Sequence, residues 1–382
     1  MITILKKYPL TLAVATLIGM IIGAGTFGIP FAVSRSGAIV GLFYLFLIGL
    51  AVMFIHLIYG EIILRTGEAC RWAGCVEQYF GAFGKKIASL IMFFQFYGSM
   101  LAYMILGGDF LKIIFGRFLG APDDFWVLLF FIIAVLAIAR GTKTMGWSEF
   151  LMTAFMFLAI AWLFVKGINF IKLDNFSGGG LTDFFLPYGV IFFALTGAPA
   201  IPEMRQILRG KERKLPKAII LGTLIPMAFY AIFTFLVLGI TGPATTPDAV
   251  SGLAPYLGAA GMVISAIFGI FAVMSSYVVL GVNMQESLYL DFGVKKQLAF
   301  ILTAAVPLFL YLLGLKSFIL IIGFIGAVFS GLDGLFMVLV YWRAKKRGDR
   351  QPEYALPKFK LLSLVLALIF SAGLIYQFVY LF

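Results

Sequence analysis

Two hydrophobic segments, half the chain apart, are interrupted in the same way by glycine and proline. The first contains the run GAGTFGIP at residues 23–30, and the second contains LTGAPAIP at residues 195–202. In a lipid bilayer every backbone N–H and C=O needs a partner, so an interrupted helix is tolerated only where it lines a cavity inside the protein. A matching pair of such breaks is typical of the substrate site of a membrane transporter.

The breaks offer main-chain groups as ligands. The N-terminus of a half-helix carries partial positive charge that suits a carboxylate, and exposed carbonyls suit an ammonium group or a metal cation. An amino acid zwitterion needs both kinds of partner. A simple glycine or proline kink would explain one break alone, but the matched position of the two breaks favours a binding site.

A pair of serines in a later hydrophobic segment could bind a hard cation. Ser275 and Ser276 follow Ala272 by three and four residues, so the two hydroxyls and the Ala272 carbonyl region share one helix face. The alternative is that these serines only hydrogen-bond back to the preceding turn, as serines in apolar helices commonly do.

Acidic and aromatic side chains are further candidates. Carboxyl groups inside a membrane are costly and usually functional, and Glu61 and Asp333 are the candidates for carrying a coupling proton. Glu203 is expected to pair with a nearby arginine instead. Tyr97 and Tyr103 are candidates for contact with a substrate, although most of the 42 Phe and 16 Tyr residues must serve packing.

The elements that position these residues are membrane helices. The 382-residue chain is 62% hydrophobic and 12% charged, with a mean hydropathy of +1.06, whereas about a quarter of the residues in a soluble domain are charged. Apolar runs long enough to cross a bilayer recur along the chain. We predict eleven spans at 9–33, 38–64, 87–114, 125–140, 146–167, 185–208, 216–241, 254–289, 297–314, 317–342 and 360–381.

The breaks fall in predicted spans one and six, with four continuous spans between them. An odd number of spans in a repeat inverts the second copy relative to the first. We therefore predict an all-α integral membrane protein that forms a single transporter domain over residues 1–382. Residues 9–167 would be the first repeat, residues 185–342 the inverted second repeat, and residues 360–381 an extra helix.

The net charge of +12 follows the membrane topology and does not indicate a nucleic-acid partner. Most of the 29 Lys and Arg residues fall on the cytoplasmic side if the N-terminus is cytoplasmic, which is the positive-inside asymmetry. We predict a multi-pass protein of the cell inner or plasma membrane with its C-terminus outside. Cys70 and Cys75 would then lie in the cytoplasm as thiols.

Two other classes of function are less compatible with the sequence. A membrane enzyme would need converging catalytic groups, yet the chain has one histidine, His56, and no cluster of metal-binding residues. A membrane channel, the alternative from a different class, favours repeated filter loops or charged rings, and the sequence contains neither. Saturable uptake that requires an ion gradient would separate a transporter from both.

Residues 19–30, GMIIGAGTFGIP, resemble the first span of the amino acid–polyamine–organocation superfamily, and the GAG-x-x-GIP pattern is similar to the aromatic and hydroxy amino acid permease branch. Residues 191–197, IFFALTG, and the serine pair of span eight resemble the leucine-transporter fold. The resemblance implies a secondary active transporter that imports a neutral, aromatic or otherwise bulky, L-amino acid by ion-coupled alternating access. Spans one and six with their partners would rock against spans 3, 4, 8 and 9.

The resemblance also implies which residues bind. The substrate carboxylate would meet backbone N–H groups near Gly23, Ala24, Gly25 and Thr26. The substrate ammonium would meet carbonyls near Phe193, Thr196, Gly197 and Ala198. One sodium ion would be held by the carbonyls of Gly19, Ile22 and Ala272 and the hydroxyls of Ser275 and Ser276.

The coupling ion stays open between Na⁺ and H⁺. Span seven lacks the amide that holds a second sodium ion in some family members, and span five lacks the lysine that replaces sodium in some proton-coupled members. The missing lysine favours sodium, whereas the most similar permease branch is largely proton-coupled. No other cofactor and no obligate protein partner is expected beside the amino acid and the lipid bilayer.

Overall fold

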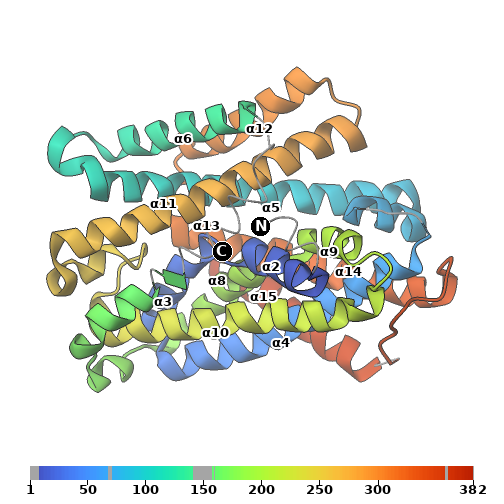
Figure 1. Cartoon of the computed structure of the whole chain (residues 1–382), viewed down its shortest axis with the longest axis horizontal. Helices are drawn as coiled ribbons and strands as arrows, with labels where there is room; N and C mark the ends of the chain where they lie inside the picture. The colour runs from blue at the N-terminus through green and yellow to red at the C-terminus, as the bar shows by residue number, and fades with distance from the viewer. Residues whose placement is uncertain (1–7, 68–70, 141–156, 159, 358–359, 382) are drawn as a thin grey trace.

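The computed structural model describes residues 8–67, 71–140, 157–158, 160–357 and 360–381 (Figure 1). Every regular element among them is helical. Most of predicted span five lies outside the described residues. The α-helices are α2 (Pro9–Ile21), α3 (Gly25–Ser36), α4 (Ala38–Arg65), α5 (Trp72–Leu119), α6 (Asp123–Ala139), α8 (Leu186–Leu195), α9 (Ile201–Ile207), α10 (Leu215–Thr241), α11 (Ala254–Glu286), α12 (Lys296–Leu312), α13 (Phe318–Phe324), α14 (Gly331–Arg347) and α15 (Lys360–Leu381).

Shorter helical turns join or interrupt these elements. The 3₁₀ turns are η1 (Ile168–Phe170), η2 (Leu173–Phe176), η3 (Leu181–Asp183), η4 (Ala198–Ala200), η5 (Glu212–Lys214), η6 (Gly242–Ala244) and η7 (Ser251–Leu253). Two π-helical segments, η8 (Ser287–Asp291) and η9 (Ile325–Ser330), continue α11 and α13.

Six of the described helices are long and apolar enough to cross a membrane, and the bent pair α2 and α3 would make a seventh span. The helix α12 and residues Ile160–Phe170 form shorter apolar helices. The prediction of an all-helical membrane protein is confirmed. The number of eleven spans and the inverted repeat remain predictions.

Both predicted interruptions are present. Helices α2 and α3 meet at an angle of 57°, because Ile22 adopts an extended conformation with ψ of 99°. Helix α8 ends before Thr196, which is also extended with ψ of 116°, and Pro199 and Pro202 then lack the N–H groups that would continue the helix. Glycine and proline thus place each break where the sequence predicts it.

The helices pack in two groups (Figure 1). Helices α5, α6, α11 and α12 pack against one another and correspond to predicted spans 3, 4, 8 and 9. The broken pairs α2–α3 and α8–α9 pack with α4 and α10, which correspond to predicted spans 2 and 7. The two broken segments therefore lie in the same group, and η9 contacts both α8 and α5.

Glycines allow α8 to approach its neighbours closely. A Cβ atom at Gly25 of α3 would lie 2.6 Å from the Cα atom of Ala194. A Cβ atom at Gly326 of η9 would overlap the carbonyl oxygen of Gly189. Small residues at such crossings let helix backbones pack without intervening side chains, so the segment that carries the second break is held from two sides.

The start of α5 corrects one expectation. Cys75 is fully buried and disulfide-bonded, so the expectation that it is a free thiol is wrong. Cys70 lies outside the described residues.

Candidate functional site

A cavity of about 70 Å³ lies between the two helix groups. This is the volume open to the centre of a water-sized sphere, of which one water molecule needs about 10–15 Å³, so the cavity has room for several ligand atoms. Among the described residues that line it, none is charged, and hydroxyl groups and aromatic rings predominate. They are Gly19, Met20, Gln95, Phe96, Ser99, Tyr103, Phe193, Thr196, Pro199, Ser275, Ser276, Val279, Leu280, Ile325 and Ser330.

The break in the first span lies between this cavity and a second, smaller one. Gly19 and Met20, before the break, line the main cavity, whereas Thr26 and Phe27, after it, line a hollow of about 30 Å³. The ring of Phe27 packs edge to face against Phe110 and Phe233, with ring centroids 5.0 and 6.0 Å apart. An aromatic cluster therefore packs around the start of α3.

Tyr230 of α10 connects the two breaks. Its hydroxyl lies 2.7 Å from the carbonyl oxygen of Ile21 and 2.9 Å from that of Ala194, and its side chain is fully buried. The two carbonyls, at the ends of α2 and α8, therefore share the single hydrogen of this hydroxyl. Tyr230 is not predicted from the sequence, because nothing distinguishes it from the other tyrosines until the helices are packed.

His56 of α4 binds the second break from the other side. The backbone N–H of Gly197 donates to His56 Nε2 at 3.2 Å, and His56 Nδ1 lies 3.3 Å from Thr223 Oγ1 of α10. Because Nε2 accepts a hydrogen bond, the imidazole is neutral and its proton is on Nδ1, which donates to Thr223. The sequence showed His56 only as the single histidine. Its position within a predicted membrane span was the available signal.

The structure brings part of the predicted substrate set to the cavity. Phe193 and Thr196 line it, and Tyr103 also does so, with its ring centroid 6.2 Å from that of Phe193. Tyr97 is partly buried but does not line the cavity. Gly197 and Ala198 are buried and do not line the cavity either.

The predicted carboxylate-binding residues are buried at the break and do not line the cavity. These residues are Gly23, Ala24, Gly25 and Thr26. The N–H of Thr26 donates to the Gly23 carbonyl at 3.1 Å, so it is already engaged. The amides of Ala24 and Gly25 have no backbone acceptor within the described part of the chain.

The predicted cation ligands of α2 and α11 lie side by side. Gly19, Ser275 and Ser276 line the cavity, whereas Ile22 and Ala272 are buried beside it. Ser276 Oγ donates to the Ala272 carbonyl at 3.0 Å. This is the hydrogen bond to the preceding turn that the sequence offered as the alternative to cation binding. A Cβ atom built on Gly23 would lie 2.8 Å from Ser276 Oγ, so this hydroxyl faces the break.

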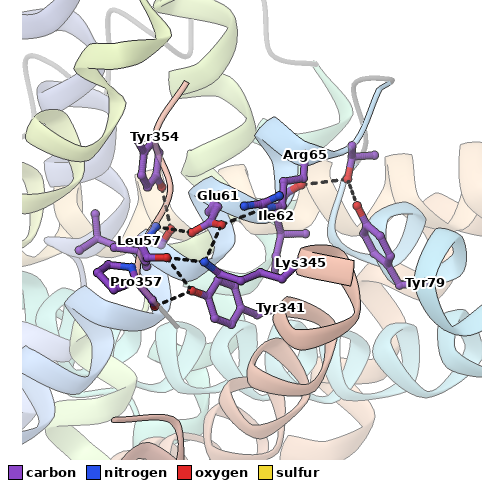
Figure 2. A network of polar contacts seen from close by, with 11 residues as sticks. Leu57, Glu61, Ile62, Arg65, Tyr79, Tyr341, Lys345, Tyr354 and Pro357 are labelled. Atoms are coloured by element: carbon purple, nitrogen blue, oxygen red, sulfur yellow. Dashed lines mark hydrogen bonds and ion pairs between the residues drawn. The ribbon is translucent and has the colours of Figure 1, made fainter. Parts of the chain in front are cut away.

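Glu61 lies in a polar cluster (Figure 2), and it does not line the cavity. It is fully buried and accepts hydrogen bonds from Arg65 Nε at 2.8 Å and from the Leu356 N–H at 2.6 Å. Lys345 Nζ lies 3.4 Å from the same carboxylate. The Tyr354 hydroxyl donates to the Leu57 carbonyl at 2.7 Å. Two cations therefore compensate the charge of Glu61, and the loop before α15 is fixed to α4 and α14.

The remaining acids differ from Glu61. Asp333 lies near Trp72 and Tyr59, and within the described ranges no cation is at ion-pair distance from it. The same holds for Glu203, so its expected arginine pair is not found there. Arg205 instead donates to the Ile63 carbonyl at 2.5 Å.

Comparison with known proteins gives concordant matches. Residues 6–377 match the tryptophan/tyrosine permease family. The chain is 26% identical over 370 residues to tyrosine-specific transport system 1 of Haemophilus influenzae, covering 91% of this chain and 90% of the relative. It is 21% identical over 325 residues to glutamine transporter 2 of Aliivibrio fischeri, covering 81% and 82%.

A solved structure has the same fold. The crystal structure of MhsT in complex with L-phenylalanine superposes with a TM-score of 0.70, covers 97% of this chain and 98% of that chain, and is 18% identical. At this identity the likeness shows the fold alone.

Proposed function

The chain belongs to the tryptophan/tyrosine permease family, and from this we propose that it is a secondary active transporter that imports a neutral aromatic L-amino acid across the plasma membrane. The resemblance to amino acid permeases of the leucine-transporter fold is confirmed by the family match and by the fold of MhsT. The aromatic substrate, the direction and the ion coupling are the proposed parts.

The uncharged, hydroxyl-rich cavity beside the second break carries this proposal. Its polar groups can hydrogen-bond an amino acid backbone, while the rings of Tyr103 and Phe193 offer apolar faces to the substrate side chain. A charged side chain would find no counter-ion among the described lining residues. The relative named as tyrosine-specific supports an aromatic substrate.

The arrangement of the breaks supports alternating access. If the N-terminus is cytoplasmic, α2 runs from the cytoplasm to the first break, and the main cavity lies on the cytoplasmic side of that break. The hollow beside Phe27 then lies on the outer side, behind the aromatic cluster. We infer an inward-facing arrangement, in which the group of broken helices would rock against α5, α6, α11 and α12.

We propose Na⁺ as the coupling ion, held by the carbonyls of Gly19, Ile22 and Ala272 and the hydroxyls of Ser275 and Ser276. Hydroxyl and carbonyl oxygens are suitable ligands for a hard cation, and the hydrogen bond that Ser276 donates leaves lone pairs on its oxygen. Proton coupling is the alternative. Asp333, which has no ion-pair partner among the described residues, is then the stronger candidate, because the Glu61 carboxylate is already engaged by Arg65 and Lys345.

Uptake into proteoliposomes tests the function. Purified protein is given a panel of labelled amino acids, with sodium and proton gradients imposed separately. We expect saturable accumulation of tyrosine, tryptophan or phenylalanine that requires one of the gradients. Flux that neither saturates nor follows a gradient would indicate a channel, and the absence of uptake of every aromatic amino acid would refute the proposal.

A further inference from the structure

We propose that His56 is a positioning residue for the substrate ammonium group. By holding the N–H of Gly197, His56 turns the carbonyl of Thr196 toward the cavity, where it can accept a hydrogen bond from the ammonium. This inference rests on the proposed function, since it assigns the means by which one end of the amino acid is recognised.

The imidazole is fixed on both sides. His56 is 1% exposed, its Nε2 accepts from the Gly197 N–H at 3.2 Å, and its Nδ1 donates to Thr223 Oγ1 at 3.3 Å. Thr223 is itself fully buried. With both ring nitrogens engaged, the ring cannot turn without losing a buried hydrogen bond, and its acceptor stays directed at the second break.

The peptide bond transmits this constraint to the cavity. In a trans peptide the N–H of one residue and the C=O of the preceding residue point in opposite directions, and every described peptide bond is trans. The Gly197 N–H points toward His56 of α4, which does not line the cavity, so the Thr196 carbonyl points away from α4. Thr196 lines the cavity.

The Thr196 carbonyl is available to a ligand. The N–H of Thr196 donates to Phe193 at 3.3 Å and its hydroxyl donates to the Phe192 carbonyl at 2.9 Å. Its carbonyl oxygen accepts no hydrogen bond within the part of the chain that the structure describes. A main-chain carbonyl without a partner is costly inside a membrane, and a substrate ammonium carries three donors.

The neighbours of Gly197 on the α2 side are apolar and cannot replace the imidazole at this amide. Gly197 packs tightly against α2, since a Cβ atom on it would lie 2.6 Å from Ile21 Cγ1 and 2.8 Å from Leu17 Cδ1. Without His56 the Gly197 N–H would be buried and unsatisfied, and the peptide plane would lose the hydrogen bond that sets its orientation. Rotation would turn the Thr196 carbonyl away from the ammonium.

Binding of paired ligands to His56 variants separates positioning from folding. The ligands are labelled tyrosine and, by competition, 3-(4-hydroxyphenyl)propionate, which lacks the amino group. We expect His56→Leu to weaken tyrosine binding by about tenfold or more and to change binding of the deamino ligand by less than about twofold.

His56→Gln keeps an acceptor for Gly197 and a donor for Thr223, so its tyrosine affinity should stay within about threefold of the native value. Equal losses for both ligands, or unchanged tyrosine binding in His56→Leu, would overturn the inference.

A spectroscopic test needs no substitution. His56 is the single histidine, so protein labelled with ¹⁵N-histidine and purified without a histidine tag gives one pair of imidazole nitrogen signals. We expect the neutral tautomer with its proton on Nδ1, and a proton on Nε2 would contradict the geometry. If the native protein bound no aromatic amino acid, the proposed function would fail, whereas the spectrum would still report whether His56 accepts from Gly197.

Discussion

Tyr230→Phe should weaken substrate binding, because the tyrosine hydroxyl joins the two broken helices. The substitution removes only the oxygen that donates to Ile21 at 2.7 Å and Ala194 at 2.9 Å. The ring is retained, so no cavity of side-chain size is left. The effect therefore comes from buried carbonyls that lose a donor.

The magnitude follows from that single hydrogen. One hydroxyl hydrogen is shared between two acceptors, so the loss counts once. Leaving a buried acceptor unsatisfied costs about 1–3 kcal/mol, which corresponds to about 5- to 150-fold in an equilibrium constant. If the breaks must lie together to bind the substrate, this loss appears as a higher Kd for an aromatic amino acid.

Tyr277→Phe is the matched control. Tyr277 of α11 is also fully buried, and its hydroxyl has no hydrogen-bond partner among the described residues. Removing that hydroxyl should leave binding close to the native value. The assay is equilibrium binding of labelled tyrosine to purified protein of each variant. Equal Kd values for Tyr230→Phe and Tyr277→Phe would refute the reasoning.

Three further perturbations follow from the packing and the polar clusters. Glu61→Gln should lower the free energy of unfolding by about 3–5 kcal/mol, because it leaves the partly buried cations of Arg65 and Lys345 uncompensated, whereas Glu203→Gln, without an ion pair in the described structure, should change thermal stability little. Gly326→Ala should abolish monodisperse expression, since its Cβ would meet the Gly189 backbone, while Gly323→Ala, whose nearest contact is 3.9 Å away, should be tolerated. Replacing Ser275 and Ser276 together by alanine should remove the sodium dependence of uptake, and an unchanged sodium response in proteoliposomes would exclude the proposed cation site.

The breaks could be predicted from sequence because glycine and proline act locally. The runs at residues 23–30 and 195–202 contain their own reason to interrupt a helix, and the structure breaks both segments there. The predicted serine pair likewise lies at the cavity, since helical spacing fixes which residues share a face.

The partners of the broken segments could not be predicted, because they come from other helices. His56 lies 141 residues before Gly197, and Tyr230 lies 209 residues after Ile21. Only the packing of α4 and α10 around the breaks brings these side chains to main-chain groups. The surroundings of Glu61 could not be predicted either, because its hydrogen-bond partner Leu356 is 295 residues away. From the sequence Glu61 is a candidate proton carrier, whereas the structure places it in a polar cluster with two cations.

The central proposal is that main-chain groups at the two breaks bind the substrate: the amides of Ala24 and Gly25 would bind the carboxylate, and the Thr196 carbonyl would bind the ammonium. A competition series measures this directly. Labelled tyrosine bound to the purified protein is displaced by unlabelled tyrosine, by tyrosine methyl ester and by the deamino acid. We expect both analogues to bind at least about tenfold more weakly than tyrosine, since each lacks a group that the breaks are proposed to bind. Displacement by either analogue at the same concentration as tyrosine would contradict a site built from main-chain groups at the breaks.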